Sequence, residues 1–382
     1  MSRPLQHPRP NTQNQPRRDA RFSPYHRPDT GPVPYEIFDF TKAADSFPNV
    51  NNRVNDEFSK LILKRNRELS PSAEDQAALA SLSRRVSFAL DNLSIASSQE
   101  LPLLEDKRVV GSYKNGTIIK GHNIVDIAVI FKDHPNLIDV ERLGKRVVEI
   151  LIENAIDENE RDVEMEMNEL GIFVDIITKS YRARLLTSTG FHSIKKTCDS
   201  NDVDSKSILQ VLTAVQHARW FDETANYTNI RIAVIIFKDL RRRIPPLEQL
   251  SIWMIELLAH YAAFDKNQHL LEVGAVIRRM FRLLASGIFL PGSASIMDPC
   301  QNKNSRVNSK MSFEDMDKVA CLAQTLLRLI SHGYYQKLLS ENDEVILDSP
   351  ITFGDVTITP STAVYSNNKK EEPANSEGHT ET

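Results

Sequence analysis

Segments with the composition of β-strands are confined to one stretch of the chain, and helical segments lie before and after them. Apolar, β-branched runs such as RVVGSY (108–113) and DIAVIF (126–131) are typical of short buried strands, and 163–180 alternates as a strand or hairpin does. From about Ser205 onward, apolar residues recur almost everywhere with helical spacing. This order predicts a mixed α/β lobe followed by a helical lobe.

Two helices are expected before the first strand, at 54–69 and 70–95. In the second, Ser70 is expected to cap the helix and Pro71 to take its first position. Another helix is expected at 137–154, between the strand segments. The apolar stripes that should face the interior include Leu79, Leu82, Val86 and Leu90; Val140, Leu143, Val147 and Leu151; and, in the helical half, Ile208, Val211, Leu250, Trp253, Val273, Val276, Met316 and Val319.

Composition sets broad limits on function. The 382 residues suffice for two packed domains, and 41% hydrophobic residues is ordinary for a soluble globular protein. Because the formal net charge is −4, nucleic-acid binding would have to come from local patches or from a partner. Cys198, Cys300 and Cys321 lack the spacing of a metal site, which favours reduced, buried thiols in the cytosol or nucleus. No apolar run approaches membrane-spanning length, and the polar start is not a signal peptide.

Both ends of the chain are expected to be disordered. Residues 1–34 contain eight prolines and six arginines but no lysine, and 349–382 is polar and mildly acidic. The leader fits either a weak nucleic-acid or import tail or a plain solvated segment. A folded body is expected at 35–348, with an α/β lobe to about residue 204 and a helical lobe from about 205.

The segment GSYKNGTIIKGHNIVDIAVIF (111–131) has the residues that hold a triphosphate. Gly111 allows close approach of the backbone to a phosphate, and Ser112 adds a hydroxyl near a helix N-terminus. Nucleotidyl transfer also needs two metal ions held by carboxylates on one face of adjacent strands. Side chains repeat their direction every two residues, so Asp126 shares its face with Ile124, which cannot bind a metal. The sequence therefore predicts an incomplete metal site.

Asp175 is the candidate for a further acid, provided that its strand lies beside DIAVIF. It is the only acid within the apolar run IFVDIIT. Asp126 itself could instead be an ordinary carboxylate that opens a strand or caps a helix. We predict no catalytic residues and no metal, and take Gly111, Ser112, Asp126 and Asp175 as candidates for nucleotide contact.

A basic run near a helix end is the candidate for nucleic-acid contact. FKDLRRRIPP contains Lys238, Arg241, Arg242 and Arg243, and Pro245 is expected to stop the helix there. The alternative is that these cations stabilise the carboxyl end of the helix through its dipole.

Several motifs resemble the DZF-domain family over about residues 35–339, in the same order and with few gaps. They include VGSYKNGTIIKGHNIVDIAVI, QHARWFDE, KDLRRRIP and GIFLPGSASIMDPC. Gly111 and Ser112 match the transferase Gly-Ser turn, Asp126 matches the second acid, and Ile124 replaces the first. MDPC (297–300) stands where synthetase-like proteins have an Asp-Pro element.

The resemblance implies the architecture of template-free nucleotidyltransferases, without catalytic activity and without a required cofactor. It also implies a nuclear heterodimer that acts in transcription and RNA processing. The expected partner is a larger DZF paralogue with double-stranded-RNA-binding domains, or a zinc-finger RNA-binding DZF protein; RNA and DNA would bind largely through that partner. The alternatives are an active transferase that uses Asp126 and Asp175, and a protein that binds a nucleoside triphosphate without turnover.

Overall fold

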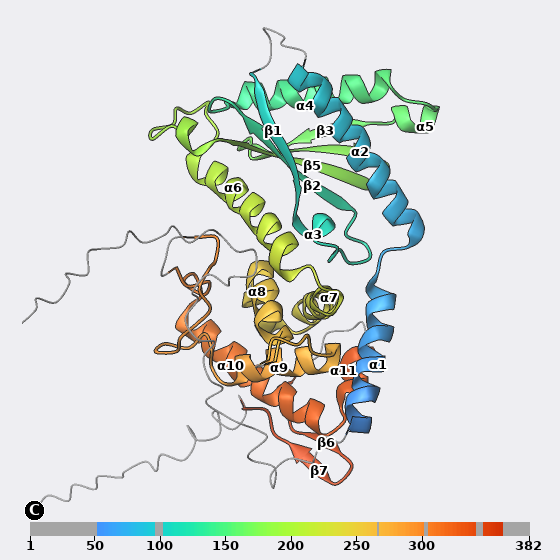
Figure 1. Cartoon of the computed structure of the whole chain (residues 1–382), viewed down its shortest axis with the longest axis vertical. Coiled ribbons are helices and arrows are strands. Elements are labelled where there is room, and N and C mark those ends of the chain that lie inside the picture. Colours follow the sequence, from blue (N-terminus) through green and yellow to red (C-terminus); the bar gives the residue numbers. More distant parts are fainter. Residues whose placement is uncertain (1–51, 96–101, 266, 302–304, 341–346, 362–382) are drawn as a thin grey trace, which may run out of the picture.

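Two lobes make up the part of the chain that the computed structural model describes, residues 52–95, 102–265, 267–301, 305–340 and 347–361. One lobe contains a sheet covered by helices, and the other consists mainly of helices (Figure 1). The arginine-rich leader predicted at 1–34 lies outside the described residues. Within those residues, no helix combines the length and the hydropathy needed to cross a bilayer.

A five-stranded sheet forms the centre of the first lobe, with the strand order β1-β2-β5-β4-β3. β2 and β5 run parallel, and the other neighbours are antiparallel. The strands are β1 (Leu104–Val110), β2 (Ile124–Phe131), β3 (Glu164–Met167), β4 (Phe173–Thr178) and β5 (Tyr181–Thr189). β5 was not predicted from the sequence, and it lies between β2 and β4, whose strands were predicted.

Helices cover both faces of this sheet. α2 (Ala73–Ile95) and α4 (Leu137–Glu153) pack on one face, where Val125 and Ile127 of β2 meet their apolar stripes. α6 (Ser205–Trp220) packs on the other face, against Ala128 and Ile130. The alternation along β2 therefore places Asp126 on the face that α6 covers. The short elements of this lobe are α3 (Gly111–Lys114), α5 (Glu158–Arg161) and η2 (Phe191–Ser193). The π-helical turn η3 (Phe221–Ala225) follows α6 and buries Phe221 and Ala225 in the core of the helical lobe.

The apolar stripes of α2 and α4 are buried as predicted, but the cap of α2 is not Ser70. Ser72 caps this helix: its Oγ accepts a hydrogen bond from the backbone of Asp75 at 3.0 Å, and Asp75 Oδ2 accepts one from the backbone of Ser72 at 3.1 Å. Ser70 instead donates from Oγ to the carbonyl of Asn66 at 2.7 Å, at the end of α1 (Asn52–Leu69). A reciprocal capping box satisfies two free N–H groups, which explains the later start.

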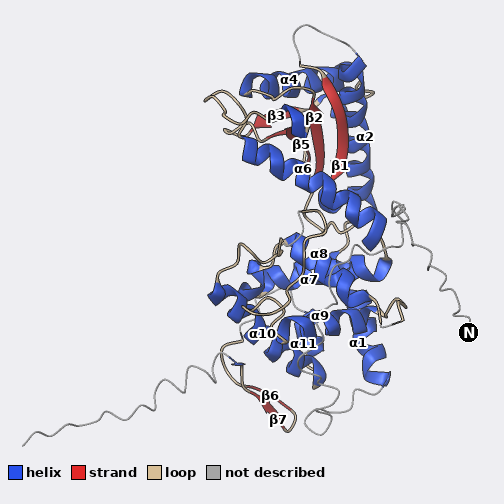
Figure 2. Ribbon diagram, turned by 60° about the vertical axis from the view of Figure 1, so that its left-hand side comes forward, coloured by secondary structure: helices blue, strands red, loops and turns tan. Residues whose placement is uncertain are grey.

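The helical lobe contains the first described helix, α1, as well as the C-terminal helices (Figure 2). α1 buries Phe58 and Ile62 in the same core as Ile236 and Phe281. The described part of the chain therefore starts in the helical lobe with α1, passes through the sheet and returns to the helical lobe. The other elements are α7 (Thr228–Arg243), η4 (Pro245–Gln249), α8 (Ile252–Ala263), α9 (Val273–Ala285), α10 (Phe313–Ser331) and α11 (Tyr335–Ser340).

This arrangement differs from the predicted division near residue 204. α1 lies in the second lobe because its apolar stripe is buried there, and α6 lies on the sheet of the first lobe. The predicted end of α7 before Pro245 is confirmed, since the helix stops at Arg243.

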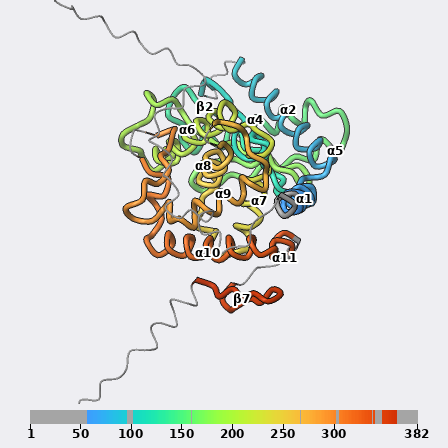
Figure 3. The backbone as a smooth tube through the Cα atoms, turned by 60° about the horizontal axis from the view of Figure 1, so that its bottom comes forward, coloured from blue at the N-terminus to red at the C-terminus, as the bar shows by residue number. Residues whose placement is uncertain are grey.

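The C-terminal tail is partly structured, so the prediction of disorder from residue 349 is wrong for residues up to 361. β6 (Ile351–Phe353) and β7 (Val356–Ile358) form a hairpin around Gly354, whose φ is +59°. The hairpin lies along the outer side of α10 (Figure 3). Ile358 is buried there, and Arg328 of α10 donates to the carbonyl of Thr359 at 3.0 Å. Alternating apolar residues next to a helix with free apolar surface explain the extra order.

Candidate functional site

The Gly-Ser turn lies directly against Asp126. β1 ends at Val110, and Gly111 begins the single helical turn α3 with φ +71°. A Cβ atom on Gly111 would lie 2.7 Å from Asp126 Oδ2. Only glycine combines this backbone conformation with so close a neighbour, so the pairing of the turn with the acid depends on Gly111.

Lys238 reaches this turn from the helical lobe. Its Nζ donates to Ser112 Oγ at 2.7 Å, to the Thr117 carbonyl at 3.0 Å and to Thr117 Oγ1 at 3.0 Å. Burial lowers the pKa of Lys238 to about 8, and the opposing effect of Glu256 is smaller. Most molecules therefore carry a protonated, charged Lys238 at neutral pH. Lys238, a candidate for nucleic-acid contact, therefore lies as a cation at the Gly-Ser turn.

Further contacts hold the turn against the second lobe. Asn115 Nδ2 donates to Oε1 of Glu256 in α8 at 3.0 Å, and burial raises the pKa of this carboxyl. Lys114 forms an ion pair with Asp222, just after α6, at 3.2 Å. The Gly-Ser turn is therefore held in place by residues of both lobes.

The acids predicted to bind a nucleotide and its metal are separated by an arginine. Asp126 of β2 pairs in register with Arg184 of β5, and Arg184 pairs with Asp175 of β4. The three residues thus form a row across one face of the sheet. The condition for Asp175 as a further acid, that its strand lies beside β2, is not met, because β5 occupies that place and forms parallel pairs along the whole of β2.

Arginines occupy both oxygens of Asp175, which is 2% exposed. Arg184 donates from Nε to Oδ1 at 2.8 Å and from Nη2 to Oδ2 at 2.9 Å, and Arg182 donates to Oδ2 at 3.2 Å. Bidentate pairs of this kind are strong and geometrically specific. A metal ion at Asp175 would have to displace both guanidinium groups.

Asp126 is the remaining acid of the row. Burial raises its pKa, while the nearby Arg184 and, to a smaller extent, His122 act in the opposite direction. The same-face position two residues earlier is Ile124, which lies opposite Arg182. A pair of metal ions bound between adjacent strands needs several free carboxylates. The residues at this site, with one free carboxylate and two guanidinium groups, do not fit that requirement.

Sequence reasoning missed Arg184 because it did not recognise β5. The segment YRARLLTST does carry a usable signal: Arg182 and Arg184 alternate with the buried Ala183 and Leu185. Such alternation is typical of a strand with two different faces. Glu256 and Asn115 had no comparable signal, since only the packing of the lobes brings them together.

The rest of the basic run at the end of α7 mainly serves the fold. Arg243 is 2% exposed, and binds Asp239 and the carbonyl of Leu338. Arg241 donates to the carbonyls of Leu250 and Glu248. Arg242 is 60% exposed and lies 3.2 Å from Asp239. Of the three arginines, Arg242 therefore has the most accessible guanidinium group, and its contact with nucleic acid stays a prediction.

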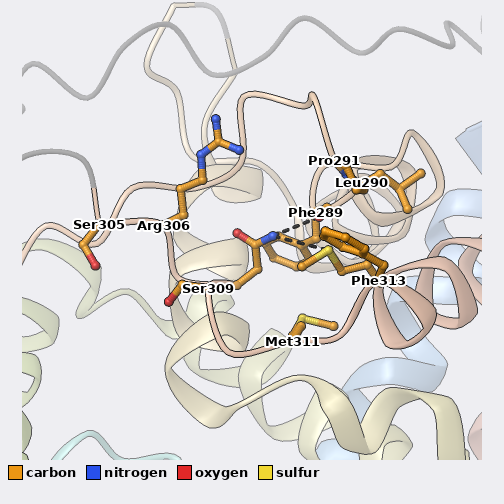
Figure 4. A pocket seen from close by; sticks show the side chains of 10 residues that line it. Phe289, Leu290, Pro291, Ser305, Arg306, Ser309, Met311 and Phe313 are labelled. Atoms are coloured by element: carbon orange, nitrogen blue, oxygen red, sulfur yellow. Dashed lines mark hydrogen bonds between the residues drawn. The ribbon is translucent and has the colours of Figure 1, made fainter.

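The helical lobe has a separate hollow of about 390 Å³ between the segment after α9 and the start of α10 (Figure 4). Phe289, Leu290 and Phe313 form much of its wall, and Asn308 Nδ2 donates to the Phe289 carbonyl at 2.9 Å. Its described lining includes Arg306 but no carboxylate, so it offers no group for metal-assisted chemistry.

Two family models match the chain: the DZF N-terminal domain over residues 20–226 and the DZF C-terminal domain over residues 229–352. Their boundary falls after α6, in agreement with the packing of α6 on the sheet. Among solved structures, the Cid1 poly(U) polymerase is 13% identical with a TM-score of 0.52, covering 76% of this chain and 99% of that one. CdnC of E. coli MS115-1, in complex with HORMA-deltaN, is 13% identical with a TM-score of 0.50, covering 75% and 98%. The predicted fold of template-free nucleotidyltransferases is confirmed.

Proposed function

Because the chain belongs to the DZF family, we propose that it is a catalytically inactive, nucleotidyltransferase-like subunit of a nuclear heterodimer. In this role it helps a larger DZF protein with RNA-binding domains to bind double-stranded RNA and DNA in transcription and RNA processing. The motifs over residues 35–339 resemble interleukin enhancer-binding factor two, which supports the assignment to the smaller subunit. No cofactor is required for this role.

The position of Arg184 is the observation that carries the proposed inactivity. In-line displacement at a phosphate depends on metal ions that neutralise charge on the attacking and leaving oxygens. Here Asp175 is bound by Arg184 and Arg182, and Ile124 supplies no ligand beside Asp126. A substrate hydroxyl would therefore lack both the activating ion and the ion that stabilises the leaving group.

A transfer assay tests this part of the proposal. The full-length chain is incubated with a single-stranded RNA, a radiolabelled nucleoside triphosphate and Mg²⁺ or Mn²⁺, and the products are separated by length. We expect no extension above the protein-free blank. If the wild-type chain extends the RNA and Asp126→Ala does not, the proposal is overturned and the chain is an active transferase.

Nucleotide binding without turnover is a second candidate function, favoured by Lys238. This buried ammonium lies 2.7 Å from the hydroxyl of the Gly-Ser turn, where a phosphate would need a positive charge. Binding to the folded state at one hundred times the dissociation constant would add about 2.7 kcal/mol to the free energy of unfolding. A thermal-shift titration with nucleoside triphosphates and Mg²⁺ should show this effect in the wild type and not in Lys238→Met. No shift at millimolar nucleotide would exclude the idea.

The subunit role is tested by isolating the full-length chain from nuclear extract and identifying the proteins that accompany it in equal amounts. We expect a larger DZF protein with double-stranded-RNA-binding or zinc-finger modules. The isolated complex should bind duplex RNA more tightly than this chain alone, and its affinity should fall with rising salt. Recovery of a monomer without a partner would contradict the proposed role.

A further inference from the structure

His217, near the end of α6, has a buried ring nitrogen without a hydrogen-bond partner. Its ring stacks on Trp253 of α8, with centroids 3.7 Å apart and planes 9° from parallel. Nε2 is buried and has no partner among the described residues. A buried, unpaired polar atom is costly, so such an atom in a well-packed site points to a ligand.

Two further donors from the MDPC segment lie beside this nitrogen. Single ligand atoms of His217, Asp298 and Cys300 all lie within 4.8 Å of one another. Asp298 is 7% exposed, and its Oδ1 accepts a hydrogen bond from the backbone of Cys300 at 2.9 Å. This bond fixes the carboxylate relative to the thiol. The backbone of Asp298 also donates to the Ser305 carbonyl at 2.9 Å, which holds the segment in place.

We propose that His217, Asp298 and Cys300 form a zinc site. One imidazole, one carboxylate and one thiolate is a ligand set that zinc accepts, with a fourth position left for water. Zinc bonds of about 2.0 to 2.3 Å place ligand atoms roughly 3.3 to 3.8 Å apart in a tetrahedron. Since the ligand atoms lie within 4.8 Å of one another, their separations need to shrink by at most about 1.0 to 1.5 Å.

Zinc would bind through the lone pair of the His217 imidazole, the Asp298 carboxylate and the Cys300 sulfur. Binding to Cys300 forms a Zn–S bond and releases the thiol proton to solvent.

The ion has a route of access. A surface hollow of about 290 Å³ adjoins His217 and is lined by polar and apolar residues of α6 together with Gln301 and Lys310. Lys206 of α6 and Lys310 on the MDPC side are the charged groups of that wall, so binding of a dication must overcome their repulsion. Asp298 supplies the opposite charge at shorter range.

A second cluster of potential ligands provides a comparison. His134, Cys198 and Asp202 also lie close together, but their polar atoms already have partners. The His134 ring contacts the Val203 carbonyl at 2.8 Å, and both oxygens of Asp202 accept from Lys195 at 2.8 and 2.9 Å. A metal there would have to break these contacts. Cys198 therefore serves as the matched control for Cys300.

Zinc at His217 would connect the two matched domains. His217 lies within residues 20–226, whereas Asp298 and Cys300 lie within 229–352. The ion would tie the end of α6, which packs on the sheet, to the segment that follows α9. It would thus restrain the same junction that Lys238 and Asn115 span at the Gly-Ser turn.

The test uses the full-length chain, stripped with a chelator and dialysed. Zinc content is measured by mass spectrometry, affinity by competition with a chromophoric chelator, and thiolate coordination by the charge-transfer absorption of the Co²⁺ form. We expect one ion per wild-type chain and a zinc-dependent rise in the midpoint of thermal unfolding. Removing a metal ligand should cost more than the 10- to 100-fold in affinity that loss of a supporting hydrogen bond costs.

Two variants separate this site from the comparison cluster and from misfolding. Cys300→Ser should keep the thermal midpoint of the metal-free wild type, lose the cobalt–thiolate band and lose the zinc-dependent rise. Cys198→Ser should bind zinc as the wild type does. A wild type that binds no zinc at micromolar concentration would overturn the proposal, as would a loss of binding in Cys198→Ser with Cys300→Ser unchanged.

Discussion

Asp239 of α7 holds the helical lobe together through two buried arginines, and its replacement by asparagine should be strongly destabilising. Its side chain is 0% exposed, and those of Arg65 and Arg243 are 3% and 2% exposed. Arg65, from α1, donates to both carboxylate oxygens at 3.0 to 3.1 Å. Arg243 donates to Oδ2 at 2.8 and 3.1 Å. One carboxylate therefore neutralises a cation from α1 and another from the end of α7 itself.

Asp239→Asn keeps the shape of the side chain but removes its charge. Arg243 then stays buried without a counter-charge, Arg65 keeps only the exposed Glu68 at 3.4 Å, and breaking a buried ion pair in this way costs about 3 to 5 kcal/mol. We expect a loss near the middle of that range, about 4 kcal/mol, because the amide oxygen can still accept one bond. The free energy of unfolding can be measured in urea from the fluorescence of Trp220 and Trp253, whose ring centroids lie 5.1 Å apart.

Arg242→Gln is the matched control, because this side chain binds the same carboxylate but is 60% exposed. An exposed ion pair contributes about 0 to 1 kcal/mol, so this variant should unfold almost as the wild type does. A loss of less than about 1 kcal/mol in Asp239→Asn would refute the reasoning that the buried network stabilises the lobe.

Two further predictions concern the Gly-Ser turn. Gly111→Ala should lower the free energy of unfolding by about 1 to 3 kcal/mol, because φ is +71° and the new Cβ would lie 2.7 Å from Asp126 Oδ2; in a double-mutant cycle measured in urea, Asp126→Ala should recover part of the loss. For Lys238, burial lowers the pKa from 10.5 to about 8, so between these pH values the unfolded state binds more protons. Stability should therefore rise across that window by about 3 kcal/mol more in the wild type than in Lys238→Met, and equal pH profiles in urea titrations would contradict this.

The lobes and their apolar faces could be predicted from the sequence because they depend on local patterns. The stripe through Leu79 and Leu90 and the alternation along β2 each need only a short window of sequence. The place of α1 could not be found in this way. Its amphipathic pattern says that Phe58 and Ile62 are buried, but not which lobe buries them.

The candidate site was only partly predictable for the same reason. Gly111, Ser112 and Asp126 belong to one local motif, and they do lie together. Asp175 is present in the row as well, but its role depends on the order of strands in the sheet, which sequence spacing does not determine. Lys238 was singled out for its charge, yet only tertiary packing shows that it points to Ser112 rather than to solvent.

Arg184 also accounts for how the sheet tolerates buried acids. Two carboxylates close together repel one another, and in a metal-dependent transferase the bound ions offset that repulsion. In this chain Arg184 pairs in register with Asp126 on one side and with Asp175 on the other. Its guanidinium group binds Asp175 through two nitrogens. Ile124 removes a further negative charge from the same face. Since an arginine is permanently charged, this arrangement supplies inside the fold the positive charge that an ion would otherwise supply. The lobe can therefore keep its Gly-Ser turn and its junction with α7 without a metal, as the proposed binding subunit requires.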